Sequence, residues 1–254
     1  MKRYLAILAL LPLLAMGGRQ QGMGPGPGMP ASAGGGGGTA SYVQSCGYNP
    51  NNSTSQTSIA CSLTSVAAGD LITVCSTWLT SSQTITVSDG TSTLTNGSAA
   101  YDGYSGNTFY GQCAYLLAAN SGNKTYTVTF SSGSVYEVIW VEEFHTTSGT
   151  WHYATAPSPQ VGGYLSPATT NTFTTTGTNQ VITMGWEYAY VGASPSGASI
   201  GGNTPTLDST ASSAIGSSQN KYYLLNIPVT GGSGSVTFTG STYWVNLVMA
   251  YDAY

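Results

Sequence analysis

Charge is the scarcest property of this sequence, because only 6% of its 254 residues are charged and only five are basic. Beyond residue 40, Lys124 and Lys221 are the only lysines, and there is no arginine. A surface with two lysines cannot neutralise a phosphate backbone, which argues against nucleic acid as a partner. Solubility must then come from hydroxyl, amide and glycine groups, a composition typical of secreted β proteins and surface fibres.

Long apolar runs are also missing, apart from one at the start. Lys2 and Arg3 precede an apolar run of about 13 residues, which is shorter than the roughly 20 needed to span a bilayer. We therefore expect residues 1–18 to be a secretory signal peptide, with no membrane span after its cleavage. The mature chain should be secreted, extracellular or held at the cell surface. Residues 19–40 are rich in Gly and Pro and predict a flexible linker.

Helical periodicity is nearly absent beyond the linker. Residues 41–254 instead contain short runs rich in Val, Ile, Thr, Tyr and Phe, separated by Gly, Ser, Asn and Pro. About eleven such runs in one stretch of this length predict a single all-β domain, an antiparallel β-sandwich or jelly roll. Among them are SIACSLTS, DLITVCSTW, KTYTVTF, YEVIWVEEF, QVITMGWEYAY and YWVNLVMAYDAY.

The strand pattern occurs twice. GDLITVCSTW is similar to NQVITMGWEY, AYLLAANSGNKTYTVTF to YYLLNIPVTGGSGSVTF, and VYEVIWVEEFH to YWVNLVMAYDA. The pairs follow the same order with offsets of about 108 to 113 residues, which indicates a duplicated strand unit. A sandwich built from both units would bury both apolar faces at once, so we expect one domain.

This series of motifs resembles a duplicated, jelly-roll-like β-sandwich domain of uncharacterised secreted bacterial surface proteins. The resemblance rests on VAAGDLITVCSTW, QCAYLLAANSGNKTYTVTFSS, YEVIWVEEF and the closing WVNLVMAYDAY, and it covers most of residues 41–254. It implies an extracellular β-sandwich, often attached to surface or adhesion proteins. It provides no catalytic residues to transfer to this chain.

Cysteine is restricted to four positions, which allow three disulfide pairings. Because export favours disulfides, we expect Cys46 to pair with Cys61 across a short polar loop, and Cys75 to pair with Cys113 between two strands. The spacings lack the paired CxxC pattern of a zinc site. We expect neither a metal nor a cofactor.

Three of the nine acidic residues lie in VYEVIWVEEFH, residues 135–145. Successive strand residues point to opposite faces, so Glu142 and Glu143 cannot act together in a regular strand. In the similar closing strand, Met249 aligns with Val141 and lies on a wholly apolar face. The core face should therefore be that of Val141, with Trp140 and Glu142 on the other face of the sheet.

Carbohydrate binding is the interpretation we favour for that other face. The strand QVITMGWEYAY places Glu187 opposite its apolar face, so Trp140, Glu142 and Glu187 are expected to converge on an outer or concave surface. A tryptophan beside carboxylates can bind a sugar ring by stacking and hydrogen bonding. These three residues are our candidate ligand-binding site.

Two enzymatic alternatives use the same residues. A glycoside hydrolase needs two carboxylates, for which Glu142 and Glu187 are the candidate catalytic pair, with Glu137 and Glu143 in reserve. A glutamic peptidase of the secreted β-sandwich type would use Glu137, with Gln112 as its partner. No motif in the sequence defines the geometry of either site, so solvated carboxylates are favoured over a catalytic pair.

We expect a secreted or cell-surface binding or adhesion module that recognises carbohydrate or another surface through aromatic side chains. Eighteen tyrosines and five tryptophans on a nearly uncharged domain supply the area that such recognition uses. Whether the chain is an enzyme stays open, with binding favoured. A structural subunit of an extracellular matrix, fibre or virion is the remaining alternative, with self-assembly through strand edges.

Overall fold

The computed structural model describes residues 38–253 with short gaps, and residues 36–254 form one compact unit. The expected signal peptide and the linker up to residue 37 lie outside the described residues. No helix in the described part is long and apolar enough to cross a membrane. The gaps fall at 51–52, 80–82, 105–106, 149, 156–159, 166–167, 170–172, 175–179, 190–196, 201–203, 205, 209–217, 229–232, 235 and 240–241.

The described residues form an all-β fold of 18 strands without a helix. The first strands are β1 (Ala40–Tyr48), β2 (Gln56–Val66), β3 (Leu71–Leu79), β4 (Ile85–Ser88), β5 (Thr95–Tyr104), β6 (Asn107–Leu116) and β7 (Gly122–Thr146). The later strands are β8 (Trp151–Thr155), β9 (Gln160–Leu165), β10 (Ala168–Thr169), β11 (Phe173–Thr174), β12 (Gln180–Ala189), β13 (Gly197–Ile200), β14 (Thr206–Asp208), β15 (Ser218–Pro228), β16 (Ser233–Gly234), β17 (Val236–Thr239) and β18 (Thr242–Ala253).

Every apolar run expected to be a strand coincides with or overlaps one of these elements, which confirms the all-β prediction. The expected number, about eleven, was too low because several strands are short or polar. Such segments are β1, β5, β8, β9, β10, β13, β14 and β16. They lack a clear alternating pattern and are stabilised by pairing with a neighbouring strand.

One long strand, β7, connects two sheets in the first half of the chain. Its N-terminal part pairs with β2 and β4, and its C-terminal part pairs with β1 and β3. Between the two parts Tyr136 has a φ of 57°, a left-handed conformation that strands do not normally contain. The strand changes sheets at this point. The resulting five-stranded sheet has the order β1-β7-β3-β6-β5.

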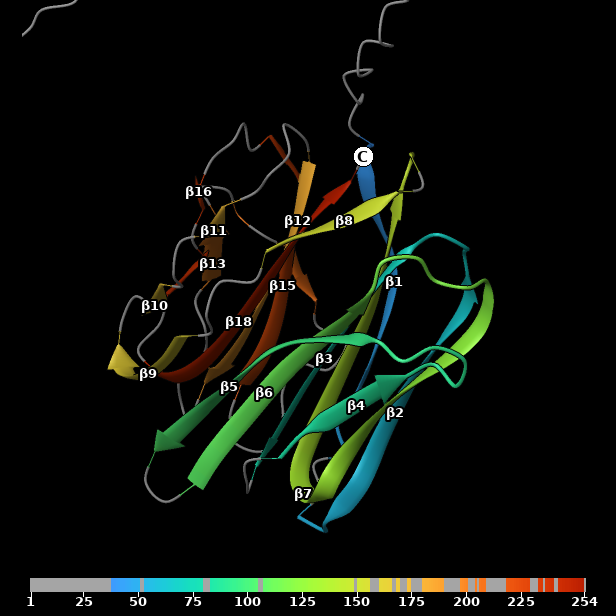
Figure 1. Ribbon diagram of the computed structural model, residues 1–254. Coiled ribbons are helices and arrows are strands. Elements are labelled where there is room, and N and C mark those ends of the chain that lie inside the picture. Colours follow the sequence, from blue (N-terminus) through green and yellow to red (C-terminus); the bar gives the residue numbers. More distant parts are fainter. Residues whose placement is uncertain are drawn as a thin grey trace, which may run out of the picture. The chain divides into compact units, whose positions relative to one another are not determined.

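The second half of the chain repeats this arrangement (Figure 1). Its larger sheet has the order β8-β18-β12-β15-β14, and a small sheet has the order β10-β17-β13, as β2-β7-β4 has in the first half. All pairings described here are antiparallel. The expected duplication of a strand unit is therefore present in the topology as well as in the sequence.

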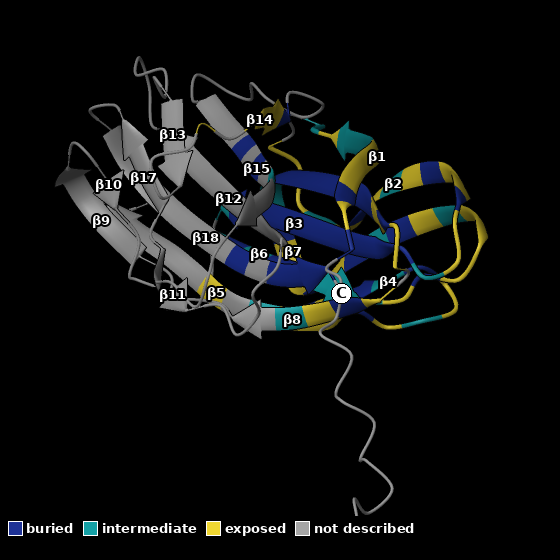
Figure 2. Ribbon diagram, turned by 90° about the horizontal axis from the view of Figure 1, so that it is seen from above, coloured by how far each residue is buried: buried dark blue, intermediate teal, exposed yellow. Residues whose placement is uncertain are grey.

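The central strands of the five-stranded sheet of the first half, β3 and the C-terminal part of β7, are buried on both faces. One face packs against β2 and β4 through residues such as Ile59, Val128 and Val141. The other face packs against the larger sheet of the second half, where Trp140 meets Met249 and its neighbours. Figure 2 shows β3 as dark blue over most of its length, as expected for a strand covered on both sides.

This packing distinguishes two positions that the sequence match made equivalent. The match aligned Met249 with Val141, but Met249 lies in the core of Trp140, and Val141 lies in the opposite core. Val74 pairs with Val141 in the first half, as Met184 pairs with Met249 in the second, so the ladders agree with the match. The two halves therefore pack together through faces that are not equivalent in the match.

Both expected disulfides are present. Cys46 is bonded to Cys61, which connects β1 to β2, and Cys75 is bonded to Cys113, which connects β3 to β6. Cys75 and Cys113 lie directly opposite each other in the ladder, with a Cα–Cα distance of 4.0 Å. Two disulfides indicate an oxidising environment such as the cell exterior.

Candidate functional site: the buried carboxylates of β7

The adjacent glutamates of β7 point to opposite faces of the sheet, as the alternation of strand side chains predicts. Both are fully buried, yet their contacts have no residue in common. Glu142 contacts Lys221 of β15, in the second half of the chain. Glu143 contacts Gln44 of β1 and the backbone before β3. The two carboxyl groups therefore belong to separate sites.

Glu142 forms an ion pair in which neither partner reaches solvent. Lys221 Nζ lies 2.8 Å from Glu142 Oε2, and the side chains of both are 0% exposed. Thr73 lies beside them: its hydroxyl donates to Glu142 Oε2 and accepts from Lys221 Nζ, each at 3.4 Å. Thr73 is opposite Glu142 in the β3–β7 ladder, which explains the contact.

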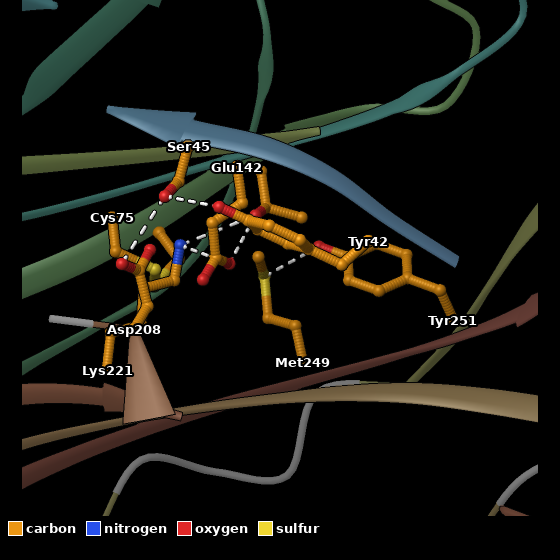
Figure 3. A network of polar contacts seen from close by, with 10 residues as sticks. Tyr42, Ser45, Cys75, Glu142, Asp208, Lys221, Met249 and Tyr251 are labelled. Carbon is orange, nitrogen blue, oxygen red and sulfur yellow. Dashed lines mark hydrogen bonds and ion pairs between the residues drawn. A yellow bond between two sulfur atoms is a disulfide. The ribbon is translucent and has the colours of Figure 1, made fainter. Parts of the chain in front are cut away.

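A second carboxyl group reaches the same place from β14. Asp208 pairs with Lys221 across the β14–β15 ladder and is buried. Ser45 Oγ donates to Asp208 Oδ1 at 3.4 Å, and Tyr42 Oη donates to Ser45 Oγ at 2.7 Å. Figure 3 shows this chain of contacts, which runs from the partly exposed Tyr42 to the buried pair.

Burial dominates the electrostatics of this cluster. It raises the pKa of Glu142 to about 7; Lys221 acts in the opposite direction, and Asp208 raises the pKa further. The surroundings are mostly apolar and aromatic, with Trp140 and Tyr251 in the same core. Protonation of Glu142 therefore changes close to neutral pH, which is unusual for a carboxylic acid.

Aromatic rings close the cluster on the side of β1. Tyr42 stacks on Tyr223 with ring centroids 5.1 Å apart and planes inclined by 7°, and Phe144 meets both rings edge to face. Burial, first of all, raises the pKa of Tyr223 to about 12. The hydroxyl of Tyr223 is therefore neutral at physiological pH, and this wall carries no charge.

Glu143 lies in a different environment at the end of the other core. Gln44 Nε2 donates to its Oε2 at 2.5 Å, and the backbone N–H of Ala67 donates to its Oε1 at 2.9 Å. Asp70 lies beside it and binds His145, whose Nδ1 is 2.7 Å from Asp70 Oδ1. The side chain of His145 is 49% exposed, so this group of residues reaches solvent.

Trp140 and Glu142 share a face as predicted, but that face is not an outer surface. Trp140 and Glu142 are both 0% exposed, because the second half of the chain covers them. The expected open platform for a sugar ring is therefore wrong at these two positions. The structure instead brings Glu142 together with Lys221 and Asp208.

The remaining candidates are placed as follows. The side chain of Glu187 lies outside the described residues, and its backbone in β12 pairs with Asn220 and Asn246. Glu137 is fully buried, and burial raises its pKa. Gln112 donates its side-chain amide to the carbonyl oxygen of Gly97 at 2.7 Å. In the described part no group of three or more His, Cys, Asp or Glu could hold a metal ion.

Sequence reasoning missed Lys221 and Asp208. A signal was available, because Lys221 is one of two lysines beyond residue 40 and alternates with Tyr223 and Leu225 on an apolar strand face. A lysine on such a face is buried only together with a partner of opposite charge. A search of the other apolar strands for a carboxylate could have found that partner.

The class of protein defined here is a duplicated all-β sandwich with a charged cluster between its halves. No family model, curated protein or solved structure matches the chain.

Proposed function

We propose that the chain is an extracellular binding module that recognises neutral carbohydrate along strand β1. Large exposed hydrophobic side chains in the described part occur on β1 and β14 alone: Tyr42, Val43, Tyr48 and Leu207. We call these four residues the β1 edge. Both strands lie at the ends of their sheets, and the contact of Ser45 with Asp208 brings them together.

The observation that supports the proposal best is the state of Tyr42. Its ring stacks on Tyr223 and its hydroxyl donates to Ser45, so it is held in place while 37% of the residue stays exposed. A ring that is already ordered loses little conformational entropy on binding a ligand. Tyrosine faces of this kind bind the apolar faces of sugars, and the scarcity of charge favours a neutral ligand over a polyanion.

A glycan array followed by titration of the best glycan tests this proposal. We expect Tyr42→Ala and Tyr48→Ala each to weaken binding at least about tenfold, since each removes a stacking ring. Tyr48→Phe keeps the ring and should bind within a factor of about three. Thr129→Ala, which changes an exposed residue of the distant small sheet, is the matched control. Equal affinity in all four variants, or an array without a bound glycan, contradicts the proposal.

Assembly through the same edge is a second candidate, supported by one observation. Among the described residues β1 pairs only with β7, so one side of this nine-residue strand has no paired strand in the described part. We expect concentration-dependent oligomers in sedimentation velocity, abolished by Val43→Lys at the bulge of β1. A monomer over the whole concentration range contradicts this candidate and leaves the carbohydrate proposal intact.

A further inference from the structure

The binding proposal makes no use of the most unusual group in the molecule, the buried amine of Lys221. Its Nζ lies 2.8 Å from Glu142 Oε2, with the carboxyl of Asp208 beside that of Glu142. Figure 3 shows the amine directed at the Glu142 carboxyl between the two sheets. One amine and two carboxyl groups are therefore enclosed in a core of aromatic and apolar side chains.

Such a site favours the neutral form of the acid, because burial raises the pKa of Glu142. Removing two charges from water costs several kcal/mol per ion, and their attraction offsets this cost only in part. The reaction requires a neutral amine, which Lys221 Nζ becomes by passing a proton to Glu142 Oε2 at 2.8 Å. A neutral amine is a nucleophile, and a neutral carboxylic acid is an acylating group.

We propose that Lys221 and Glu142 condense in the folded protein to form an intramolecular isopeptide bond. A bond forms between Nζ of Lys221 and Cδ of Glu142, and the bond between Cδ and its hydroxyl oxygen breaks. The hydroxyl leaves as water with one proton from Nζ. No atom changes its oxidation state, so neither an oxidant nor a co-reactant is required.

Asp208 is placed to carry the proton. Its carboxylate lies beside Glu142 and opposite Lys221 in the β14–β15 ladder. It accepts the proton that Nζ loses and delivers it to the departing hydroxyl, as a general base and then a general acid. Ser45 donates to Asp208 Oδ1 at 3.4 Å, which orients this carboxylate.

Glu142 is the acceptor of the bond, rather than Asp208, for a geometric reason. Asp208 pairs with Lys221 on the neighbouring strand, and its carboxyl group contacts that of Glu142. Glu142 lies on β7 in the facing sheet, and its oxygen is already at contact distance from Nζ. Reacting groups held in this way can reach effective concentrations of about 10⁵ M or more.

The bond would join β7 to β15 and hence the two halves of the duplicated unit. Water is excluded from the site, since both side chains are fully buried, and this favours condensation over hydrolysis. A covalent link between the two halves also suits a protein displayed outside the cell, where it cannot be refolded by cytoplasmic chaperones. The link would be independent of the two disulfides and would survive reduction.

Trypsin provides a direct test, because it cleaves after a lysine only when the amine is free. Lys124 and Lys221 are the only basic residues beyond residue 40, and Lys124 is the internal control. We expect the reduced, denatured full chain to be cleaved after Lys124 and not after Lys221. Its intact mass should be lower than that of the unlinked chain by one water, about 18 Da.

Lys221→Arg is the matched variant, because arginine keeps the positive charge and cannot form this amide. It should show the full mass and be cleaved at position 221, which proves that the site is accessible after denaturation. Cleavage of the wild-type chain at both lysines with no mass deficit would overturn the proposal and leave an ion pair only. Tandem mass spectrometry should find the branched peptide at Glu142, and a branch at Asp208 would overturn the assigned acceptor.

The role of Asp208 has its own test. In Asp208→Asn the amide should form at least about tenfold more slowly, measured as the uncut fraction at fixed times after synthesis. Asp89→Asn, which changes a buried aspartate far from the cluster, should form it at the wild-type rate. Equal rates in both variants would contradict proton transfer through Asp208. We expect none of these variants to lose glycan binding, so the amide and the binding proposal are tested separately.

Discussion

The two faces of β7 carry the same kind of carboxyl group in two different settings. Glu142 and Glu143 are neighbours in the chain, and each lies beside an aspartate and a nitrogen base. On one face the base is Lys221, which is fully buried between two sheets. On the other it is His145, which is half exposed near the end of β7 and contacts Asp70. What surrounds a carboxylate is thus decided by the neighbouring sheet and not by the local sequence.

The difference also concerns how each charge is stabilised. Glu143 accepts hydrogen bonds from a side-chain amide and from a backbone N–H, so these two donors are neutral. Glu142 has Lys221 as its only ion-pair partner in the described part. Removal of one partner should therefore have very different consequences on the two faces.

The largest effect should come from Lys221→Met. The variant leaves the Glu142 carboxyl buried without Lys221 Nζ, whether that atom is its cation or its amide partner, and should lower the free energy of unfolding by about 3–5 kcal/mol, measured by urea denaturation at pH 7. Lys124→Met is the matched control, because Lys124 pairs with Asp89 and Asp89 also accepts two backbone hydrogen bonds, which remain when the lysine is removed. A loss in Lys221→Met no greater than in Lys124→Met would contradict the special role of the buried pair.

The pH dependence of stability should separate the two faces next. Lys221→Arg leaves Glu142 free to titrate, and burial raises the pKa of this carboxyl from an ordinary value of 4.5 to about 7. Between these values the folded state holds a proton that the unfolded state has released, so stability falls as the pH rises. We expect a loss of about 3 kcal/mol between pH 4.5 and pH 7, levelling off above.

Adding Glu142→Gln to that variant provides the control for the pH experiment. The steep part of the profile should disappear, because no carboxyl remains at this position to release a proton. Glu143 contributes a slope of the same sign, since burial raises its pKa as well, and it is unchanged in both proteins. Identical profiles with and without Glu142 would show that this carboxyl does not titrate in the expected range.

The smallest effect should come from Gln44→Ala on the other face. Glu143 then loses one of two hydrogen-bond donors but keeps the backbone N–H of Ala67, so stability should fall by about 1 kcal/mol. Gln83→Ala, which removes a bond to Ser132 at the exposed edge, is the comparison. A loss from Gln44→Ala as large as from Lys221→Met would remove the distinction between the two faces.

Several features of the fold follow from local properties of the chain. Alternating runs of β-branched and aromatic residues located the longer strands, and the spacing of the four cysteines led to the correct pairs, Cys46 with Cys61 and Cys75 with Cys113. Strand alternation also separated Glu142 from Glu143. These predictions succeeded because they depend on residue type, a period of two and short loops.

The candidate site could not be predicted in the same way. Trp140 and Glu142 were expected on an open face, because a mixed polar and apolar pattern usually indicates solvent on one side. The match of β18 to β7 also made Met249 equivalent to Val141, but these two residues lie in different cores. Alternation predicts which residues share a face, and it does not predict which sheet covers that face.

The sequence by itself determined the all-β class, the duplication of its strand unit and both disulfides. Tertiary structure alone decided that the sheet containing Glu142 is covered on both sides, and that Lys221 and Asp208 come from strands of the second half to meet it. The physical reason is that alternation and propensity act between near neighbours, whereas burial and charge pairing depend on which sheet packs against which. For this chain that packing placed an amine and two carboxyl groups where no water reaches them.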